Sequence, residues 1–129
     1  MNKVYLSGNL GSDAEVKELP NGTKVSKLSL ATNESYKDSK TNEWVKKTTW
    51  HNVVVYRDCS DFKKGERVFV EGKIEMRDWQ DKEGNKRQNF EIVVGTYEGQ
   101  INKFAGKQED IHQVYEQQQT IENVGEIPF

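Results

Sequence analysis

Apolar and polar residues alternate with a period of two through most of residues 1–100, and this pattern constrains the fold more than any other feature. A period of two is typical of a β-strand with one buried and one exposed face, because successive side chains of a strand point to opposite sides of the sheet. Val4, Leu6 and Gly8, for example, share one face of a first strand. The alternation therefore predicts an all-β domain.

Turn-forming residues divide the alternation into strands. Pro20-Asn21-Gly22 is a strong turn signal, because Pro fixes φ and Asn-Gly supplies φ > 0. Asp81–Asn85 predicts a hairpin loop, and the polar stretch Tyr36–Glu43 predicts a longer, flexible one. The expected strands are Asn2–Leu10, Glu15–Glu18, Lys24–Asn33, Trp44–Arg57, Arg67–Trp79 and Arg87–Val94, with Gly95–Asn102 as a candidate edge segment.

Five or six strands joined by long hairpins indicate a small Greek-key barrel, of either the OB type or the SH3-like type. Asp58–Phe62 has room for about one helical turn between the third and fourth strands, at 3.6 residues per turn. The strand lengths and the position of this turn favour the OB type. The predicted fold is an all-β, five-stranded Greek-key OB barrel with long hairpin loops, a shortened helical turn between strands 3 and 4, and a flexible acidic C-terminal tail.

Charge divides the chain into two parts. Gln108–Phe129 carries five carboxylates and no Lys or Arg, so its net charge is −5. Residues 1–107 carry all 19 basic residues against the other 16 acidic ones, a net charge of +3. A basic body suits a polyanion and an acidic tail does not, so we expect the two parts to meet different partners. We assign residues 1–104 to one folded domain and residues 105–129 to a disordered acidic tail.

Aromatic residues fall where an OB barrel presents its binding face and loops. Tyr36 and Trp44 flank the first long loop, and Trp79 lies where the second hairpin begins. Trp50 and Tyr56 are six residues apart and share a face if their strand has no bulge. Lys and Arg interleave with these rings. Single-stranded nucleic acid needs such a surface, because unpaired bases stack on rings and cations neutralise phosphates. The alternative is that the rings fill the core or a subunit interface.

The sequence offers no catalytic or metal-binding constellation. The single cysteine, Cys59, excludes an internal disulfide and a Cys-based zinc site. His51 and His112 lack a nucleophile or ligand partner, and no carboxylate pair has a spacing suited to catalysis. We expect no enzymatic activity, no metal and no cofactor. No apolar stretch has the length of a signal peptide or a membrane span, so we expect a cytoplasmic protein that does not bind membranes.

Seven short motifs stand in a characteristic order. They are Asn2-Lys3-Val4, Gly8-Asn9-Leu10-Gly11, Pro20-Asn21-Gly22, Leu30-Ala31-Thr32, Thr49-Trp50-His51, Val70-Glu71-Gly72-Lys73 and the terminal Ile127-Pro128-Phe129. Their order and spacing resemble those of the bacterial-type single-stranded DNA-binding protein family (SSB family). This resemblance implies an OB fold, a homotetramer and sequence-independent binding of single-stranded DNA. It further implies a nucleoid-associated cytoplasmic protein that acts in DNA replication, recombination and repair.

The resemblance also assigns roles to residues. The implied stacking aromatics are Tyr36, where the family usually has Trp, Trp50, Tyr56, where it usually has Phe, and Trp79. The basic residues expected to contact DNA are Lys3, Lys37, Lys46, Lys47, Arg57, Lys73, Arg77 and Arg87. His51 matches a family histidine near the subunit interface. The tip Glu126-Ile127-Pro128-Phe129 resembles the peptide with which the family recruits replication and repair proteins.

The chain departs from the family pattern in its tail and in its helical segment. The linker is short and has no Gly/Pro-rich stretch, which reduces its reach. Gly125-Glu126 stands where the family usually has consecutive Asp residues, so we expect weaker docking of the tip.

A second functional hypothesis is an OB-type adaptor that uses its barrel for protein or RNA contacts. A small nuclease is a third and poorer one.

Overall fold

The computed structural model of the chain describes residues 1–104, which form seven β-strands and no helix. The strands are β1 (Val4–Leu10), β2 (Glu15–Glu18), β3 (Lys24–Lys37), β4 (Trp44–Val55), β5 (Arg67–Gln80), β6 (Lys86–Val94) and β7 (Gln100–Lys103). Within this part of the chain there is consequently no helix with the length and hydropathy of a membrane span. The proposed tail, with its Glu126–Phe129 tip, lies outside the described residues.

Five of the strands close into a barrel, and β1 is the strand that closes it. β1 pairs antiparallel with β3, with Leu10 opposite Leu30, and antiparallel with β5, with Leu6 opposite Val70. β4 completes the ring by pairing antiparallel with β3 and parallel with β6, which pairs with β5. This closed five-stranded arrangement is the OB barrel that the sequence predicts. β2 extends the sheet beside β3, and β7 beside β5.

The buried half of the alternation fills the barrel. Its core consists of Leu10, Leu28, Leu30, Val53, Val55, Cys59, Phe62, Val68, Val70, Ile92, Val94 and Ile101. Opposite residues of a strand pair share a face of the sheet, so apolar residues meet across the strands; Leu28, for example, lies opposite Val53, and Leu10 opposite Leu30. Burial raises the pKa of the Cys59 thiol, as expected for a cysteine that serves only in packing.

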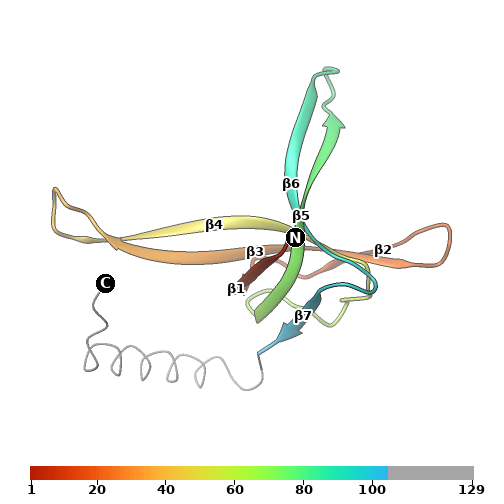
Figure 1. Cartoon of the computed structure of the whole chain (residues 1–129), viewed down its shortest axis with the longest axis horizontal. Helices are drawn as coiled ribbons and strands as arrows, with labels where there is room; N and C mark the ends of the chain where they lie inside the picture. The colour runs from red at the N-terminus through yellow and green to blue at the C-terminus, as the bar shows by residue number, and fades with distance from the viewer. Residues whose placement is uncertain (105–129) are drawn as a thin grey trace.

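Two long hairpins leave the barrel in different directions, one made of β3 and β4 and the other of β5 and β6 (Figure 1). Both continue the strands of the barrel without interruption, so the alternation of faces inside the barrel also fixes which side chains share a face on each hairpin. Each hairpin therefore presents two faces to solvent, and the pairing register shows which residues lie on each face.

The structure differs from the sequence prediction in the length of β3. We expected this strand to end at Asn33, with Tyr36 in a loop, but pairing with β4 continues to Lys37 opposite Trp44. The loop narrows to residues 38–43, where the backbone N–H of Asp38 donates to the carbonyl of Glu43 at 2.8 Å. A ladder of backbone hydrogen bonds to the long β4 partner outweighs the polar, turn-forming composition of this stretch.

The segment between β4 and β5 forms two hydrogen-bonded turns and no helix; in the second turn the backbone N–H of Glu66 donates to the carbonyl of Lys63 at 3.2 Å, and the first lies at the predicted place. The backbone N–H of Phe62 donates to the carbonyl of Cys59 at 2.9 Å. Ser26, which is fully buried, holds the start of this turn: its hydroxyl donates to the Arg57 carbonyl at 2.6 Å and accepts from the Cys59 N–H at 2.8 Å. These bonds and the burial of Phe62 fix the segment on the barrel, and the helical turn predicted at Asp58–Phe62 is a hydrogen-bonded turn in its place.

Candidate nucleic-acid interface

The pairing register places most of the predicted site residues on one surface. On β4, Trp50 lies opposite Ala31, while its neighbour His51 lies opposite the core residue Leu30. Trp50 therefore belongs to the side of the sheet that faces away from the core. We call this side, continued over β2, β3, β4, β6 and β5, the outer face. It carries Lys17, Lys27, Lys37, Trp44, Lys46, Trp50, Val54, Lys73, Glu75, Arg77, Trp79, Arg87, Glu91 and Val93.

Three of the four predicted stacking aromatics lie on this face. Trp50 is 60% exposed and Trp79 is 42% exposed. Tyr56 directly follows β4, lines a groove of the outer face together with Val54, and has its backbone N–H bonded to the Val94 carbonyl at 3.0 Å. Both tryptophans thus present ring surface to solvent while their backbones belong to the ladder, which is the arrangement of a stacking platform and not of a core residue.

Local contacts orient the two indole rings. The ring of Trp50 lies over Gly11, where a Cβ would come within 2.5 Å of it, so only glycine leaves room for the ring in this position. The Nε1–H of Trp79 donates to the side-chain oxygen of Asn89 at 3.1 Å, in the amide orientation that satisfies both ends of Asn89. The contact between Gly11 and Trp50 joins segments that are distant in the sequence, so only the tertiary structure reveals it.

A groove of about 570 Å³ crosses the outer face between Tyr56 and the start of the β5–β6 hairpin. Lys17, Lys27 and Arg77 line it together with apolar residues of β3, β4, β5 and β6 and with the carboxylates of Glu75, Asp78 and Glu91. Sequence reasoning missed Lys17 and Lys27 as site residues. The signal was present, because Lys27 stands between buried Ser26 and Leu28 and must therefore point away from the core.

Carboxylates neutralise several of the predicted cations. Arg77 Nη1 lies 3.3 Å from Glu91 Oε1, and Lys73 Nζ lies 3.1 Å from Glu75 Oε1. Since Glu75 and Glu91 face each other across β5 and β6, each cation also relieves the repulsion between these two carboxylates. The outer face of β5 and β6 is thus close to charge balance next to the barrel.

A further ion pair lies at the tip of the β5–β6 hairpin, where Arg87 Nε is 3.3 Å from Asp81 Oδ2. Hydrogen bonds to the carboxylate, first from the backbone N–H of Asn85 and then from Arg87, hold the pKa of Asp81 below its usual value. Asp81 therefore stays ionised and organises the loop that follows Trp79. Solvent screens an exposed pair of this kind, so a phosphate can replace the carboxylate at little cost.

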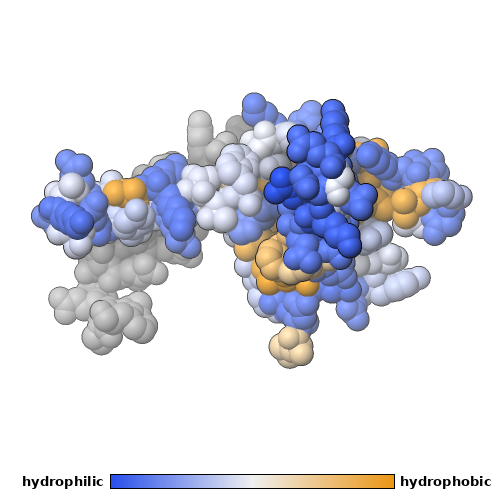
Figure 2. Space-filling view, turned by 90° about the horizontal axis from the view of Figure 1, so that it is seen from above, coloured by the Kyte–Doolittle hydropathy of each residue, from blue (hydrophilic) through white to orange (hydrophobic). Residues whose placement is uncertain are grey.

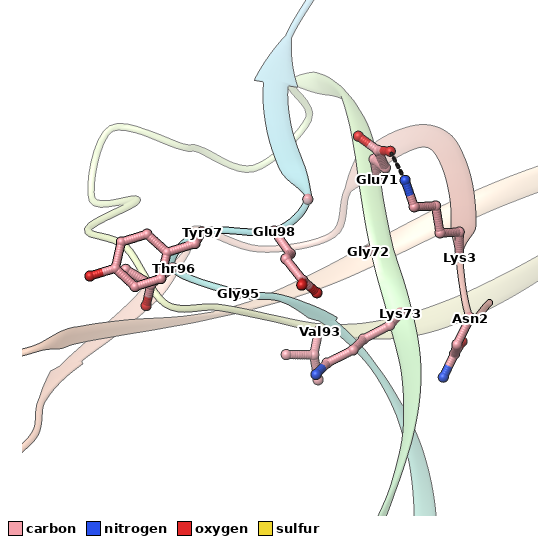
Figure 3. Close-up of a pocket in the computed structure, with 11 residues that line it drawn as sticks. Asn2, Lys3, Glu71, Gly72, Lys73, Val93, Gly95, Thr96, Tyr97 and Glu98 are labelled. Atoms are coloured by element: carbon pink, nitrogen blue, oxygen red, sulfur yellow. Dashed lines mark ion pairs between the residues drawn. The ribbon is translucent and has the colours of Figure 1, made fainter.

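Three of the predicted cations gather beside the loop between β6 and β7 and not at the aromatic rings. Lys3 and Lys73 line a cavity of about 320 Å³ whose other walls include the backbones of Gly72, Gly95 and Gly99 (Figure 3). Lys3 Nζ lies 3.5 Å from Glu71 Oε1 in this cavity. Arg57 Nη2 donates to the Gly99 carbonyl at 3.1 Å, which ties the same loop to the end of β4.

Tyr36, Lys47 and His51 point to the other side of the β3–β4 hairpin. Tyr36 lies opposite Val45, and Lys47 opposite Glu34. We call this side the inner face of the hairpin, since it continues the core-facing side of the barrel. Tyr36 is 51% exposed there. Within one chain, the structure therefore separates Tyr36 from the three aromatics of the outer face.

His51 is half-buried at the base of the inner face. Its Nε2 shares a hydrogen bond of 2.8 Å with Thr32 Oγ1, and the tautomer of the ring decides which atom donates. Within residues 1–104 no group of three or more His, Cys, Asp or Glu side chains has a geometry that could hold a metal ion. The part that His51 plays here is to join β3 and β4 by side chains as well as by backbone.

The face of the molecule seen in Figure 2 is mostly hydrophilic and carries scattered apolar areas, the largest of them over the barrel. A closed OB barrel whose outer face combines exposed indole rings with lysines belongs to the class of barrels that bind single-stranded nucleic acid. The rings offer stacking to any base, and the cations offer charge to any backbone, so neither depends on nucleotide sequence.

Comparison with known proteins agrees with this class. Residues 1–100 match the model of the single-strand binding protein family, and the chain belongs to that family. Proteins of this family bind DNA and are not enzymes. Among solved structures, an SSB of Plasmodium falciparum in complex with single-stranded DNA is 36% identical to the chain. It superposes with a TM-score of 0.70, over 81% of this chain and 95% of that one.

Replacing Gly11 by Ala is expected to weaken binding of oligo-dT several-fold with little loss of stability. The new Cβ would meet the far end of the Trp50 ring, which can swing away without disturbing the barrel. Fluorescence titration measures the affinity, and thermal unfolding measures the stability. Unchanged affinity would show that the position of the Trp50 ring over Gly11 is not important for binding.

Proposed function

We propose that this chain binds single-stranded DNA without sequence preference and protects it during replication, recombination and repair. The observation that carries the proposal is the alignment of Trp50, Tyr56 and Trp79 on one outer face of an OB barrel. Membership of the single-strand binding protein family supports it, as does the likeness to an SSB in complex with single-stranded DNA. A cytoplasmic, nucleoid-associated location follows from this role.

Binding combines stacking with exchange of ion pairs. Unpaired bases stack on Trp50, Tyr56 and Trp79, each contributing about 1–3 kcal/mol. Phosphates are drawn to the lysines of the outer face and to Arg77 and Arg87, which leave their carboxylate partners for the DNA. Tyr36 and Lys47, on the inner face of the β3–β4 hairpin, contact DNA that passes around the hairpin. Lys3, Arg57 and Lys73 act at the barrel end, beside the β6–β7 loop.

Titration of the intrinsic tryptophan fluorescence with oligo-dT tests the proposal. We expect strong quenching that weakens as salt rises, because binding releases counterions from the phosphates. Trp50→Ala and Trp79→Ala should each lose about 5- to 150-fold in affinity, the equivalent of one stacked base, and both should keep the melting temperature.

Three results would contradict the proposal. The absence of quenching, or an equal preference for duplex DNA, would favour the adaptor function instead. Unfolding of the two alanine variants would show that these rings serve packing and not binding.

We further propose that the chain works as a homotetramer in which His51 lies near a subunit interface. The support is family membership, together with the large apolar side chains that residues 1–104 leave exposed, among them Ile74, Met76 and Phe90. Sedimentation velocity should show particles that contain four chains of 14.9 kDa each, both in the free protein and in its complex with oligo-dT. A species of one chain at micromolar concentration would reject the tetramer.

We also propose that Glu126, Ile127, Pro128 and Phe129 recruit replication and repair proteins. The support lies in the sequence: this tip ends the acidic segment of the chain and keeps the terminal apolar residues of the family pattern. The full chain should retain such proteins from a bacterial lysate, and a variant that lacks only Phe129 should lose them while binding oligo-dT equally well. Equal retention by both forms would exclude recruitment through the tip.

A further inference from the structure

Trp44 is the most exposed of the three tryptophans and has no assigned role. It is 72% exposed, compared with 60% for Trp50 and 42% for Trp79. It is the first residue of β4, at the far end of the β3–β4 hairpin, where it lies opposite Lys37. An indole ring that is this exposed on a regular strand is available to a partner, since it contributes nothing to the core.

The register places Trp44 on the same outer face as Trp50. Going out along β4, alternate residues from Trp50 are Thr48, Lys46 and Trp44, and their partners on β3 are Ala31, Asn33, Ser35 and Lys37. The strand carries no bulge in this stretch, because its pairing with β3 is continuous. Six residues of strand place the two tryptophans about 20 Å apart. The outer face thus continues without a break from the barrel to Trp44.

Charge distinguishes the two sides of the hairpin. On the outer face beyond Trp50 the strands carry Lys37 and Lys46 and no carboxylate. On the inner face, Glu34 lies directly opposite Lys47 beside Tyr36, so the charges there cancel. Neither Lys37 nor Lys46 has a carboxylate of residues 1–104 within 4.0 Å. The outer side is therefore the side that attracts a polyanion.

The backbone around Trp44 is ordered enough to serve as a platform. The N–H of Asp38 donates to the Glu43 carbonyl at 2.8 Å, and the Asp38 carboxylate accepts from the Lys40 N–H at 2.8 Å. These bonds close the loop next to the Lys37–Trp44 pair. A ring on such a closed hairpin loses little conformational freedom when a base stacks on it.

We propose that Trp44 is a further base-stacking residue, and that bound single-stranded DNA runs from the barrel along the outer face of the β3–β4 hairpin. Lys37 and Lys46 contact the phosphates on this path. This inference rests on the proposed binding of single-stranded DNA and adds to it a site at the hairpin end. The occupant is an unpaired stretch of nucleic acid, because it alone combines stacking bases with the negative charge that the two lysines attract.

Single-tryptophan fluorescence tests the inference. In the Trp50→Phe Trp79→Phe double variant, Trp44 is the one remaining tryptophan, and oligo-dT should quench its emission. Binding of fluorescently labelled oligo-dT is measured separately, by anisotropy, for the wild type and for each variant. Trp44→Ala should weaken binding about 5- to 150-fold, and Trp44→Phe should retain most of the affinity, since a phenyl ring still stacks.

Val45→Ala is the matched control, because Val45 is the adjacent residue on the inner face and is expected to leave the affinity unchanged. The inference would be overturned if the wild type binds oligo-dT, Trp44→Ala binds it as tightly and the emission of Trp44 is not quenched. That result would leave the proposed function intact. A change in sedimentation of Trp44→Ala without loss of affinity would assign the ring to a contact between copies and would also overturn it. Absence of binding by the wild type would reject both proposals.

Discussion

The closure of the barrel by β1 is the interaction on which the rest of the structure depends. β1 pairs with β5 over most of its length and with β3 at its end, so it joins the two sides of the sheet into a ring. The backbones of β1 and β3 lie very close together here: a Cβ at Gly8 would lie 2.0 Å from the carbonyl oxygen of Ala31. A glycine is therefore required where β1 crosses from one partner to the other.

Once the ring is closed, every strand has an inside and an outside. The inside must hold Leu30, Val53, Val70 and their neighbours, because no other arrangement buries the apolar half of the alternation. A shift of one residue in any register would expose the core and bury lysines. The same alternation of inward-facing and outward-facing side chains continues beyond the barrel into both hairpins. Trp50 and Trp44 therefore share a face although about 20 Å of strand separates them.

Much of the fold could be predicted from the sequence, because many strands and turns are determined by residues that are neighbours in the chain. β2 has the predicted bounds Glu15–Glu18, since a strong turn at Pro20-Asn21-Gly22 follows it. The end of β3 could not be predicted, because residues 34–37 are polar and their strand conformation comes from pairing with β4. Likewise, the ion pairs of Arg77 and Lys73 depend on the register between β5 and β6, which no single strand reveals.

The candidate site residues were chosen from the sequence by their type, and the structure shows where each of them lies. The sequence indicated aromatics and cations, and the structure divides them among the outer face, the inner face of the β3–β4 hairpin and the barrel end. Lys17 on β2 and Lys27 on β3 show that the alternation contained more information than the spacing of aromatics, because their positions relative to the buried residues place both on the outer face. The role of Gly11 beneath Trp50, by contrast, links segments that are distant in the sequence.

The central claim is that one face of the barrel binds single-stranded DNA. Amide chemical-shift mapping of the full chain with oligo-dT tests it most directly. The largest changes should follow Lys27, Trp50 and Arg77 on the outer face. They should be small around Tyr5 and Phe69, whose rings stack with centroids 6.2 Å apart on the outside of the β1–β5 pair. Changes centred on Tyr5 and Phe69, with Trp50 and Arg77 unaffected, would contradict the claim.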